Sequence, residues 1–231
     1  MLSKKVLIVL VEGISDQTAL EGVVAQFISQ NGLVRFKVND GDILTRYQII
    51  NNSVGTAVLK CMKKYSYNKK DIFKVVHLID IDGCYVSNDK IVYDCSITEG
   101  CLYSENEIRT NNVEYKIKKN ENKRKSISAL ISKKFVLKDV PYEIYYFSCN
   151  LDHCLYNEVN LLGSKKTEMA SEFNAQYEND LQGFISFIKE QCPEKSEQDS
   201  WKVLTEEINS LKRGSNFYLF FTKSNESLSK I

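Results

Sequence analysis

Two short acidic motifs carry residue types that can bind a divalent metal ion and transfer protons. The first spans residues 12–16 and reads Glu-Gly-Ile-Ser-Asp, and the second spans residues 80–83 and reads Asp-Ile-Asp-Gly. Carboxylates that gather in one place repel one another unless a cation lies between them. Hard oxygen ligands suit Mg²⁺, which binds one or two carboxylates and keeps water molecules that a phosphate group can displace. The two motifs therefore indicate metal-dependent phosphate chemistry.

The segments around the motifs predict how they are positioned. Apolar, β-branched runs at residues 5–11 and 73–79 are typical of buried parallel strands. Between them, apolar residues at 20–28 and 54–65 recur at helical spacing, and residues 33–38 alternate as a strand. This βαβαβ order predicts a parallel sheet with helices on both faces. Because ligands of such sheets bind outside the carboxyl ends of the strands, both motifs are expected at the same edge.

The helix starts and the rest of the chain can also be predicted. Ser15 or Asp16 is expected to cap the first helix, and Asn52 or Ser53 the second. Downstream, the patterns predict loops and short pieces of secondary structure at 84–115, a helix at 123–135, a strand at 143–147, helices around 169–188 and 201–211, and a strand or packed tail at 217–221. Residues 1–150 are therefore expected to form an α/β domain. Residues 151–231 are expected to form a mostly helical extension packed on it.

A third polar cluster, at residues 148–153, follows the predicted strand at 143–147. If that strand is parallel to the others, Asn150, Asp152 and His153 lie at the same edge as the two acidic motifs. Two interpretations stay open for this cluster. It contributes to a metal site, or it is an Asx-type helix cap beside a packed histidine.

Basic residues are concentrated in one segment, although the net charge of the chain is only +1. Residues 116–138 hold nine Lys or Arg against a single acidic residue, Glu121. A charge run of this kind is either a solvated helix face or a surface that neutralises the phosphates of a nucleic acid. In the second case, the expected contacts are Lys116, Lys118, Lys119, Lys123, Arg124 and Lys125.

Composition restricts the class of protein. The chain has 231 residues, of which 43% are hydrophobic, and this is enough for a sizeable core. Its longest aliphatic run, residues 6–11, is far shorter than the roughly 20 residues that span a bilayer, and Glu12 and Gly13 follow it where a signal peptide would have a cleavage site. We expect a cytoplasmic protein without a membrane partner.

The seven cysteines include no Cys-x-x-Cys pair, so a structural zinc site is not expected. Cys149, His153 and Cys154 come nearest to a metal cluster, but small core residues are the favoured interpretation for the cysteines. His77 lies within a predicted strand and is expected in the core.

The two acidic motifs together resemble the Toprim domain of primases, topoisomerases, OLD-family nucleases and ribosomal-RNA maturation nucleases. The resemblance covers about residues 5–90 and implies a Toprim-like fold that binds Mg²⁺, with Mn²⁺ able to substitute. It implies that Glu12 is the general acid or base and also a metal ligand, and that Asp80 and Asp82 are catalytic metal ligands. Asp16 is similar to an additional metal ligand of the nuclease branch. Asp152 stands where Toprim nucleases of phage defence have a glutamate.

The expected function is a Mg²⁺-dependent nuclease that cuts RNA or DNA, as a stand-alone effector of phage defence. Lys165 or Lys166 would stabilise charge on the phosphate, and Thr45 and Arg46, beyond a turn at residues 40–42, could touch it. The chain has no Walker A loop, so any ATPase sensor would be a separate protein, and a homo-oligomer is compatible with this function.

Two other functions stay open. Residues 78–83 also resemble the signature of haloacid-dehalogenase phosphatases, in which Asp80 would be the nucleophile and Asp82 the acid/base. The chain could also be a non-catalytic Toprim module that binds a nucleic acid or a partner ATPase.

Overall fold

The computed structural model describes residues 6–31, 35–39, 50–192 and 196–228, with side chains described for all of these except 35–39, 50–53 and 224–228. The chain divides into two compact units, each assembled from segments that are far apart in the sequence. Unit 1 comprises Met1–Ile79, Ser126–Tyr145 and Thr167–Phe184, and unit 2 comprises Asp80–Lys125, Tyr146–Lys166 and Ile185–Ile231. The predicted boundary at residue 150 stays a prediction.

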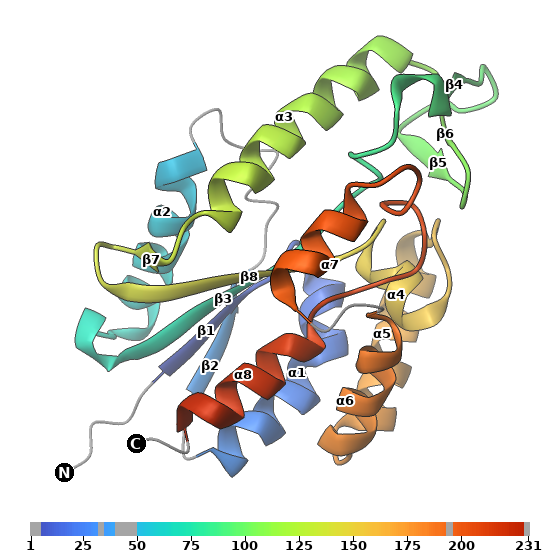
Figure 1. The fold of residues 1–231 in the computed structure, drawn as a ribbon. Helices are drawn as coiled ribbons and strands as arrows, with labels where there is room; N and C mark the ends of the chain where they lie inside the picture. The colour runs from blue at the N-terminus through green and yellow to red at the C-terminus, as the bar shows by residue number, and fades with distance from the viewer. Residues whose placement is uncertain (1–5, 32–34, 40–49, 193–195, 229–231) are drawn as a thin grey trace. The chain divides into compact units, whose positions relative to one another are not determined.

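Unit 1 is an α/β structure built on a sheet with the strand order β2-β1-β3-β8-β7 (Figure 1). The last residue of β3 and the last two residues of β8 belong to unit 2. Helices α3, α5 and α6 each have residues in both units. The elements wholly or partly in unit 1 are β1 (Val6–Leu10), α1 (Ile14–Gln30), β2 (Arg35–Asn39), α2 (Ile50–Tyr65), a 3₁₀ helix (Lys69–Asp71), β3 (Ile72–Asp80), α3 (Val113–Ile131), β7 (Phe135–Val136), β8 (Val140–Phe147), α5 (Gly163–Tyr177) and α6 (Leu181–Glu190).

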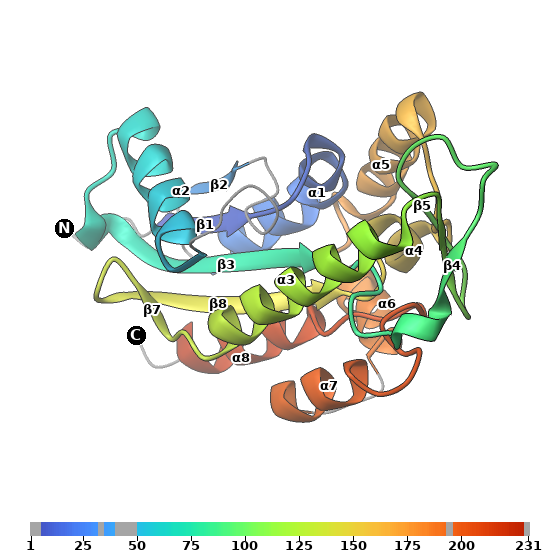
Figure 2. The same ribbon diagram turned by 90° about the horizontal axis from the view of Figure 1, so that it is seen from above.

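Strand β1 is an interior strand of this sheet, and all five of its residues are apolar and buried. It pairs in parallel with β2 on one side and with β3 on the other, with Leu7 opposite Phe36 and Lys74. Figure 2 shows β1, β3 and β8 side by side, and Figure 1 shows α1 and α2 on opposite faces of the strands. The predicted parallel arrangement with helices on both faces is therefore confirmed for β1, β2 and β3. Antiparallel β7 makes the complete sheet mixed.

Both predicted helix caps were wrong by a few residues. Helix α1 is capped at Gly13, whose backbone N–H donates to Oδ2 of Asp16 over 2.9 Å. Asp16 lies in the first turn of α1, where the helix dipole favours a carboxylate. The start of this helix is therefore defined by Gly13 together with the aspartate three residues later. Helix α2 begins at Ile50, before Asn52 and Ser53.

Helix α1 packs closely on α5 within unit 1. The N–H of Gly22 donates to Oδ1 of Asn174 over 2.8 Å, and Nε2 of Gln26 donates to the carbonyl of Tyr177 over 2.9 Å. A Cβ atom on Gly22 would lie 2.6 Å from Cβ and 2.7 Å from Cα of Glu178. The two helices therefore approach closely only because residue 22 has no side chain.

Gly22→Ala is expected to lower the free energy of unfolding by about 1–3 kcal/mol, because the backbone of Glu178 must move to admit the methyl group. Gly55→Ala in α2 is the matched control, since its Cβ would meet only Cδ2 of Leu137, at 3.5 Å. The control should be neutral or slightly stabilising because alanine is the better helix former. Urea titration of both variants measures the difference, and equal effects would contradict the close packing of α1 on α5.

Unit 2 contains a small second sheet in the region predicted as loops and short pieces, a prediction that did not specify any sheet. Its three strands have the order β4-β6-β5, with β4 parallel and β5 antiparallel to β6. Each strand has only three residues, too few for a visible alternation, and a cluster of Val86, Ile91, Ile108 and Leu211 buries one face. The elements wholly in unit 2 are a 3₁₀ helix (Asn88–Lys90), β4 (Ile91–Tyr93), β5 (Cys101–Tyr103), β6 (Ile108–Thr110), α4 (Leu151–Tyr156), α7 (Glu197–Leu204) and α8 (Tyr218–Leu228).

Two helices differ from their predicted form. Helix α3 begins ten residues before the predicted start, and Phe135 lies in β7 and not in the helix. The segment at 217–221, predicted as a strand or packed tail, contains the start of helix α8, which begins at Tyr218. Phe217, Phe220 and Phe221 have helical spacing, and their rings pack on one another with centroids 5.0–5.8 Å apart. The predicted helical character of the C-terminal region is confirmed.

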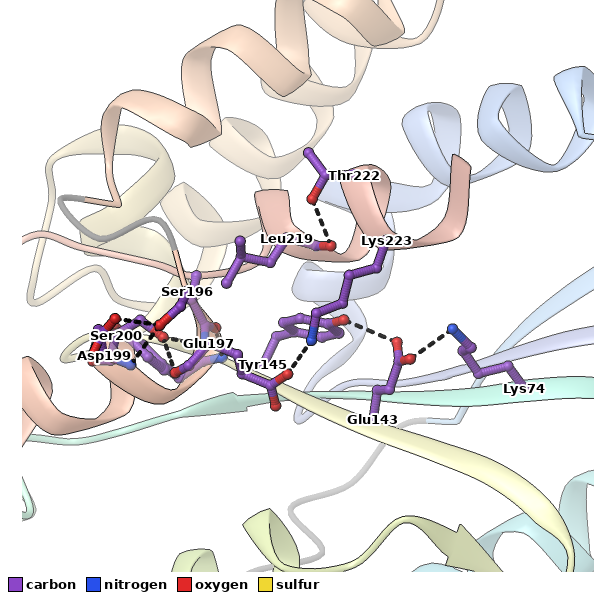
Figure 3. Close-up of polar contacts among 12 residues, drawn as sticks. Lys74, Glu143, Tyr145, Ser196, Glu197, Asp199, Ser200, Leu219, Thr222 and Lys223 are labelled. Atoms are coloured by element: carbon purple, nitrogen blue, oxygen red, sulfur yellow. Dashed lines mark hydrogen bonds and ion pairs between the residues drawn. The ribbon is translucent and has the colours of Figure 1, made fainter. Parts of the chain in front are cut away.

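Polar side chains within each unit form hydrogen bonds and ion pairs (Figure 3). In unit 1, Glu143 pairs with Lys74 over 2.7 Å and accepts a hydrogen bond from the Tyr145 hydroxyl over 2.9 Å. In unit 2, Glu197 at the start of α7 forms an ion pair with Lys223 of α8. His77 is buried as predicted, with Nδ1 2.9 Å from the hydroxyl of Tyr142.

Within the ranges given above, no helix has both the length and the apolar character needed to cross a membrane.

Candidate active site

Asp80 is the last residue of β3, and its carboxylate binds the start of helix α4. Its Oδ1 accepts the N–H of Leu151 over 2.8 Å. Asn150 caps the same helix, with its side-chain oxygen accepting the N–H of His153 over 2.8 Å. The Asx-type cap, one of the two interpretations left open for this cluster, is therefore present. A carboxylate from β3 supplements it at the positive end of the helix dipole.

The segments that follow β3 and β8 lie side by side in unit 2. The N–H of Ile81 donates to the carbonyl of Phe147 over 3.0 Å, and the N–H of Asp82 donates to the carbonyl of Cys149 over 2.6 Å. The residue numbers rise together along the two segments, so the segments run in the same direction. The structure therefore brings the Asp80–Asp82 motif together with the start of α4, which carries Asp152.

Asp82 is held by lysines of helix α3. Its Oδ2 lies 2.5 Å from Nζ of Lys123, and its carbonyl accepts a hydrogen bond from Nζ of Lys116 over 3.0 Å. Burial by itself would raise the pKa of Asp82, but the charges of Lys123 and Lys116 outweigh it and lower this pKa to about 2. Burial lowers the pKa of Lys116, opposed by the charge of Asp82. The Asp82 carboxylate is therefore ionised and neutralised by a lysine from the protein itself.

Asp152 differs from Asp82 because one of its oxygens has no partner. The residue is 2% exposed, and its Oδ2 pairs with Nζ of Lys166 over 2.8 Å. Its Oδ1 is buried and makes no hydrogen bond within the described part of the chain. Burial raises the pKa of Asp152 although Lys166 acts in the opposite direction. A buried carboxylate oxygen without a partner is costly and is stabilised by an added cation.

The neighbouring histidine is buried and neutral. His153 is 5% exposed, and its Nδ1 has no hydrogen-bond partner in the described part of the chain. Burial and the charge of Arg213 both lower its pKa. Arg213 also donates from Nε to the carbonyl of Cys154 over 2.9 Å, which places a cation beside helix α4.

The thiols around Asp82 are unsuited to metal binding or nucleophilic attack at neutral pH. Burial raises the pKa of Cys84 to about 12 and also raises the pKa of Cys149. A thiol must lose its proton before it acts as a ligand or nucleophile. The predicted core role is thus confirmed for four buried cysteines, Cys61, Cys84, Cys149 and Cys154, while Cys95 is exposed.

The two acidic residues of the first motif lie in unit 1. Glu12 follows β1 and is half-buried. Asp16 is 5% exposed, and its carboxylate accepts the N–H of Gly13 and, over 3.3 Å, the hydroxyl of Ser15. Asp16 therefore has a clear structural role at the start of α1, whatever else it does.

The basic residues of α3 fall into two groups. Lys116 and Lys123 are buried against the Asp82 turn, and Arg124 donates to the carbonyl of Cys84 over 2.6 Å. Lys118 and Lys125 are exposed, and Lys119 is half-buried. Any contact between α3 and phosphate groups would therefore use this second group. The predicted helix began at residue 123, ten residues too late, so it did not include Lys116. The sequence therefore did not indicate that Lys116 and Lys123, which are seven residues or about two helical turns apart, lie on the same face of α3.

The turn at residues 40–42, with Thr45 and Arg46, lies outside the described residues. Among those that are described, no three His, Cys, Asp or Glu side chains are grouped so that they could hold a metal ion by themselves. Sequence reasoning singled out Lys166, which pairs with Asp152, but it missed Tyr103 and Arg213. Tyr103 has its ring 5.0 Å from the Lys116 ammonium, and an aromatic residue in a weakly patterned loop gives no signal for this contact.

No protein-family model, curated protein or solved structure matches this chain.

Proposed function

We propose that the chain is a divalent-metal-dependent nuclease with a Toprim-like fold, which hydrolyses phosphodiester bonds of RNA or DNA. The observation that carries this proposal is the buried, unpartnered Oδ1 of Asp152 on helix α4, whose first N–H is bound by Asp80. Acidic groups at the carboxyl ends of neighbouring strands, next to a helix N-terminus, are where an α/β sheet binds its ligands. The resemblance of the two acidic motifs to Toprim nucleases supports the choice of reaction.

The chemistry of the donors at α4 fits a Mg²⁺ ion. Asp80 and Asp152 supply hard carboxylate oxygens, and Mg²⁺ needs only one or two of these because waters and substrate phosphates complete its shell. The unpartnered oxygen of Asp152 would gain a cationic partner. Asp82 fits less well, because Lys123 already neutralises its carboxylate.

Each functional residue then has a defined task. A bound Mg²⁺ would polarise the phosphate and lower the pKa of a bound water. Asp80 and Asp152 would hold the cation, with Asp80 fixed in orientation by the N–H of Leu151. The ammonium of Lys166, held by Asp152, would face the charge that develops on the phosphate oxygens. The resemblance to Toprim nucleases assigns proton transfer to Glu12, which lies in unit 1, and this role stays a prediction.

The geometry disfavours the phosphatase alternative. A haloacid-dehalogenase phosphatase would need a protonated Asp82 to donate to the leaving group. The pKa of Asp82 is lowered to about 2, chiefly by the lysines against the effect of burial, so it has no proton to give at neutral pH. Asp80 would also have to serve as nucleophile while accepting a helix N–H.

One observation favours the second candidate, a non-catalytic Toprim module. The Lys123–Asp82 ion pair closes the turn without any metal ion, as expected if the site has only a structural role. Such a module would bind nucleic acid or a partner ATPase without cutting. The two candidates differ in whether Mn²⁺ binds at Asp152.

Cleavage of end-labelled single- and double-stranded RNA and DNA in Mg²⁺ or Mn²⁺ tests the proposal. Cutting should require the metal and fall by at least about a hundredfold in Asp152→Asn, which removes charge but little volume. Asp89→Asn, at an exposed carboxylate, is the control and should keep full activity. If purified protein neither cuts nor binds Mn²⁺, the non-catalytic module becomes the better conclusion. Because a phage-defence effector could be latent alone, the assay is repeated with any ATPase that co-purifies from the native host.

A further inference from the structure

A surface of unit 1, separate from the candidate site, carries many cations and few acids. The sequence has no Asp or Glu between residues 43 and 70. Helix α2, the 3₁₀ helix that follows it and the segment around β7 all lie in unit 1. We call their exposed lysines the lysine surface, and these residues are Lys60, Lys63, Lys64, Lys70, Lys134 and Lys138. Asp80 and Asp152 of the candidate site belong to unit 2.

Two contacts join the segments that carry the lysine surface. Nζ of Lys69 lies 2.5 Å from Oδ1 of Asp139, which connects the 3₁₀ helix to the turn between β7 and β8. Helix α2 lies against the same turn, since a Cβ atom on Gly55 would be 3.5 Å from Cδ2 of Leu137. Figure 2 shows α2, β7 and the start of β3 at one end of the sheet. The six lysines therefore belong to one continuous region of unit 1.

The charges of the lysine surface are not balanced by acids of the described residues. Lys60, Lys63 and Lys64 are three or four residues apart, so they share the exposed side of α2, where like charges repel one another. In the ranges that the structure describes, none of the six exposed lysines forms an ion pair. The acid nearest in sequence to Lys70 is Asp71, whose side chain accepts the backbone N–H of Asn68. An anionic ligand would relieve this repulsion.

Exposed apolar side chains accompany the lysines. Phe135 of β7 is 53% exposed and follows Lys134 directly, and Leu59 of α2 is 52% exposed and precedes Lys60. Phenylalanine is usually buried, so an exposed ring next to a cation suits a ligand that has both a flat apolar face and negative charge. Unpaired bases and their phosphates have this combination, and proteins bind single strands with aromatic rings beside cations. Because the bases of a duplex are already stacked on one another, Phe135 favours a single strand.

We propose that the lysine surface binds the phosphates of single-stranded RNA or DNA, with Phe135 stacked on an unpaired base. The class of ligand rests on the proposed function, whereas the surface itself needs no metal ion. That function favours a nucleic acid over an anionic membrane, the other partner that cations beside apolar side chains attract. The surface is also not the predicted basic segment at 116–138, because Lys60, Lys63, Lys64 and Lys70 lie outside that segment.

Fluorescence anisotropy of short labelled RNA and DNA strands tests this inference on the full chain, in EDTA so that binding is measured without cleavage. Lys60→Gln/Lys63→Gln should raise the Kd at least about fivefold. It should also reduce the slope of log K against log salt by about 1.4, because each lost contact to a single strand removes about 0.7. Lys70→Gln/Lys134→Gln is a second pair with the same expected result.

Lys189→Gln/Lys202→Gln is the matched control, because it neutralises two exposed lysines of unit 2 and changes the net charge equally. This control should change the Kd less than about twofold. Glutamine suits a helix, and the substituted lysines of the test pairs have no ion pairs in the described part of the chain, so these variants should fold. Circular dichroism and a melting curve check this.

Phe135→Ala tests the choice of a single strand. It should raise the Kd for single strands at least about fivefold, which corresponds to the loss of one stacked base, and leave binding to a duplex of the same sequence unchanged. Equal losses for both forms would show that the single-strand assignment is wrong. Vesicles that contain phosphatidylserine are the third ligand. If they bind through the lysines while the strands do not, the partner is a membrane and the proposal is overturned.

The outcomes separate this inference from the proposed function. If both lysine pairs bind the strands as tightly as the wild type, or if the control loses as much affinity, the inference is wrong even where the wild type cuts in Mg²⁺. No binding by the wild type would also overturn it. If the wild type binds strands through the lysine surface but cuts none of them with Mg²⁺ or Mn²⁺, the inference stands and the nuclease does not.

Discussion

Asp80→Asn is expected to lower nucleic-acid cleavage at least about a thousandfold, equivalent to about 4 kcal/mol of transition-state stabilisation. The asparagine side chain keeps an oxygen that can accept the N–H of Leu151, so the start of α4 should be preserved. What is lost is the negative charge that would hold the cation. Initial rates of cleavage under saturating Mn²⁺, together with a melting curve, measure the two effects separately.

Asp80→Ala is the informative companion to this variant. It removes both the charge and the acceptor, so it should lose cleavage to a similar degree and also lower the free energy of unfolding by about 0.5–2 kcal/mol, as other capping residues do. If Asp80→Asn retains cleavage while Asp80→Ala loses it, the role of Asp80 is to cap α4, and its assignment as a metal ligand is wrong.

Lys123→Met is expected to destabilise the protein by about 3 kcal/mol, because it removes a buried ammonium and leaves the half-buried Asp82 carboxylate without its closest cation. Lys116 still binds the carbonyl of Asp82, so the loss should be at the lower end for a broken buried pair. Urea unfolding of Lys123→Met, Asp82→Asn and the double variant forms a cycle. The double variant should be more stable than the sum of the single effects predicts.

The pH dependence of stability provides a second check on the same pair. An unfolded aspartate has a pKa near 3.9, and in the folded chain the lysines, against burial, lower the pKa of Asp82 to about 2. The unfolded state therefore binds the proton first as the pH falls. The pair contributes about 2 kcal/mol above pH 4, and this contribution is lost progressively toward pH 2. Asp82→Asn should show a shallower loss of stability in this range, and an unchanged slope would contradict the strength of the pair.

The sheet and the position of the second motif follow from apolar runs in the sequence. Strands β1 and β3 are buried continuous runs, and such runs occur where a strand has neighbours on both sides. Asp80 was predicted just after the end of β3, and it is the last residue of that strand. A helix cap was one of the two interpretations that the residue types at 148–153 left open, and Asn150 is a cap in the structure.

The start of helix α3 could not be predicted correctly because the buried face of its first half consists of polar residues. Hydrophobic periodicity detects a helix only when its inner face is apolar. In α3, the buried positions from Lys116 to Lys123 carry charges and an amide, and only Ile127 and Leu130 further along are apolar. Lys116 and Lys123, which were predicted as phosphate contacts, instead bind Asp82 on this buried face. A pairwise charge interaction between residues 41 positions apart leaves no trace in a single sequence.

Gly83 sets a limit on how this protein can diverge. Its φ is +61°, and a Cβ atom there would lie 2.5 Å from Cδ2 of Leu211 and 2.9 Å from Cδ1 of Ile108. Any substitution would have to overcome an unfavourable backbone and displace two apolar side chains at once. In distant homologues, we therefore expect glycine to persist at this position even where Asp80 or Asp152 has been replaced. The glycine by itself would then be a poor guide to which homologues keep the proposed metal ligands.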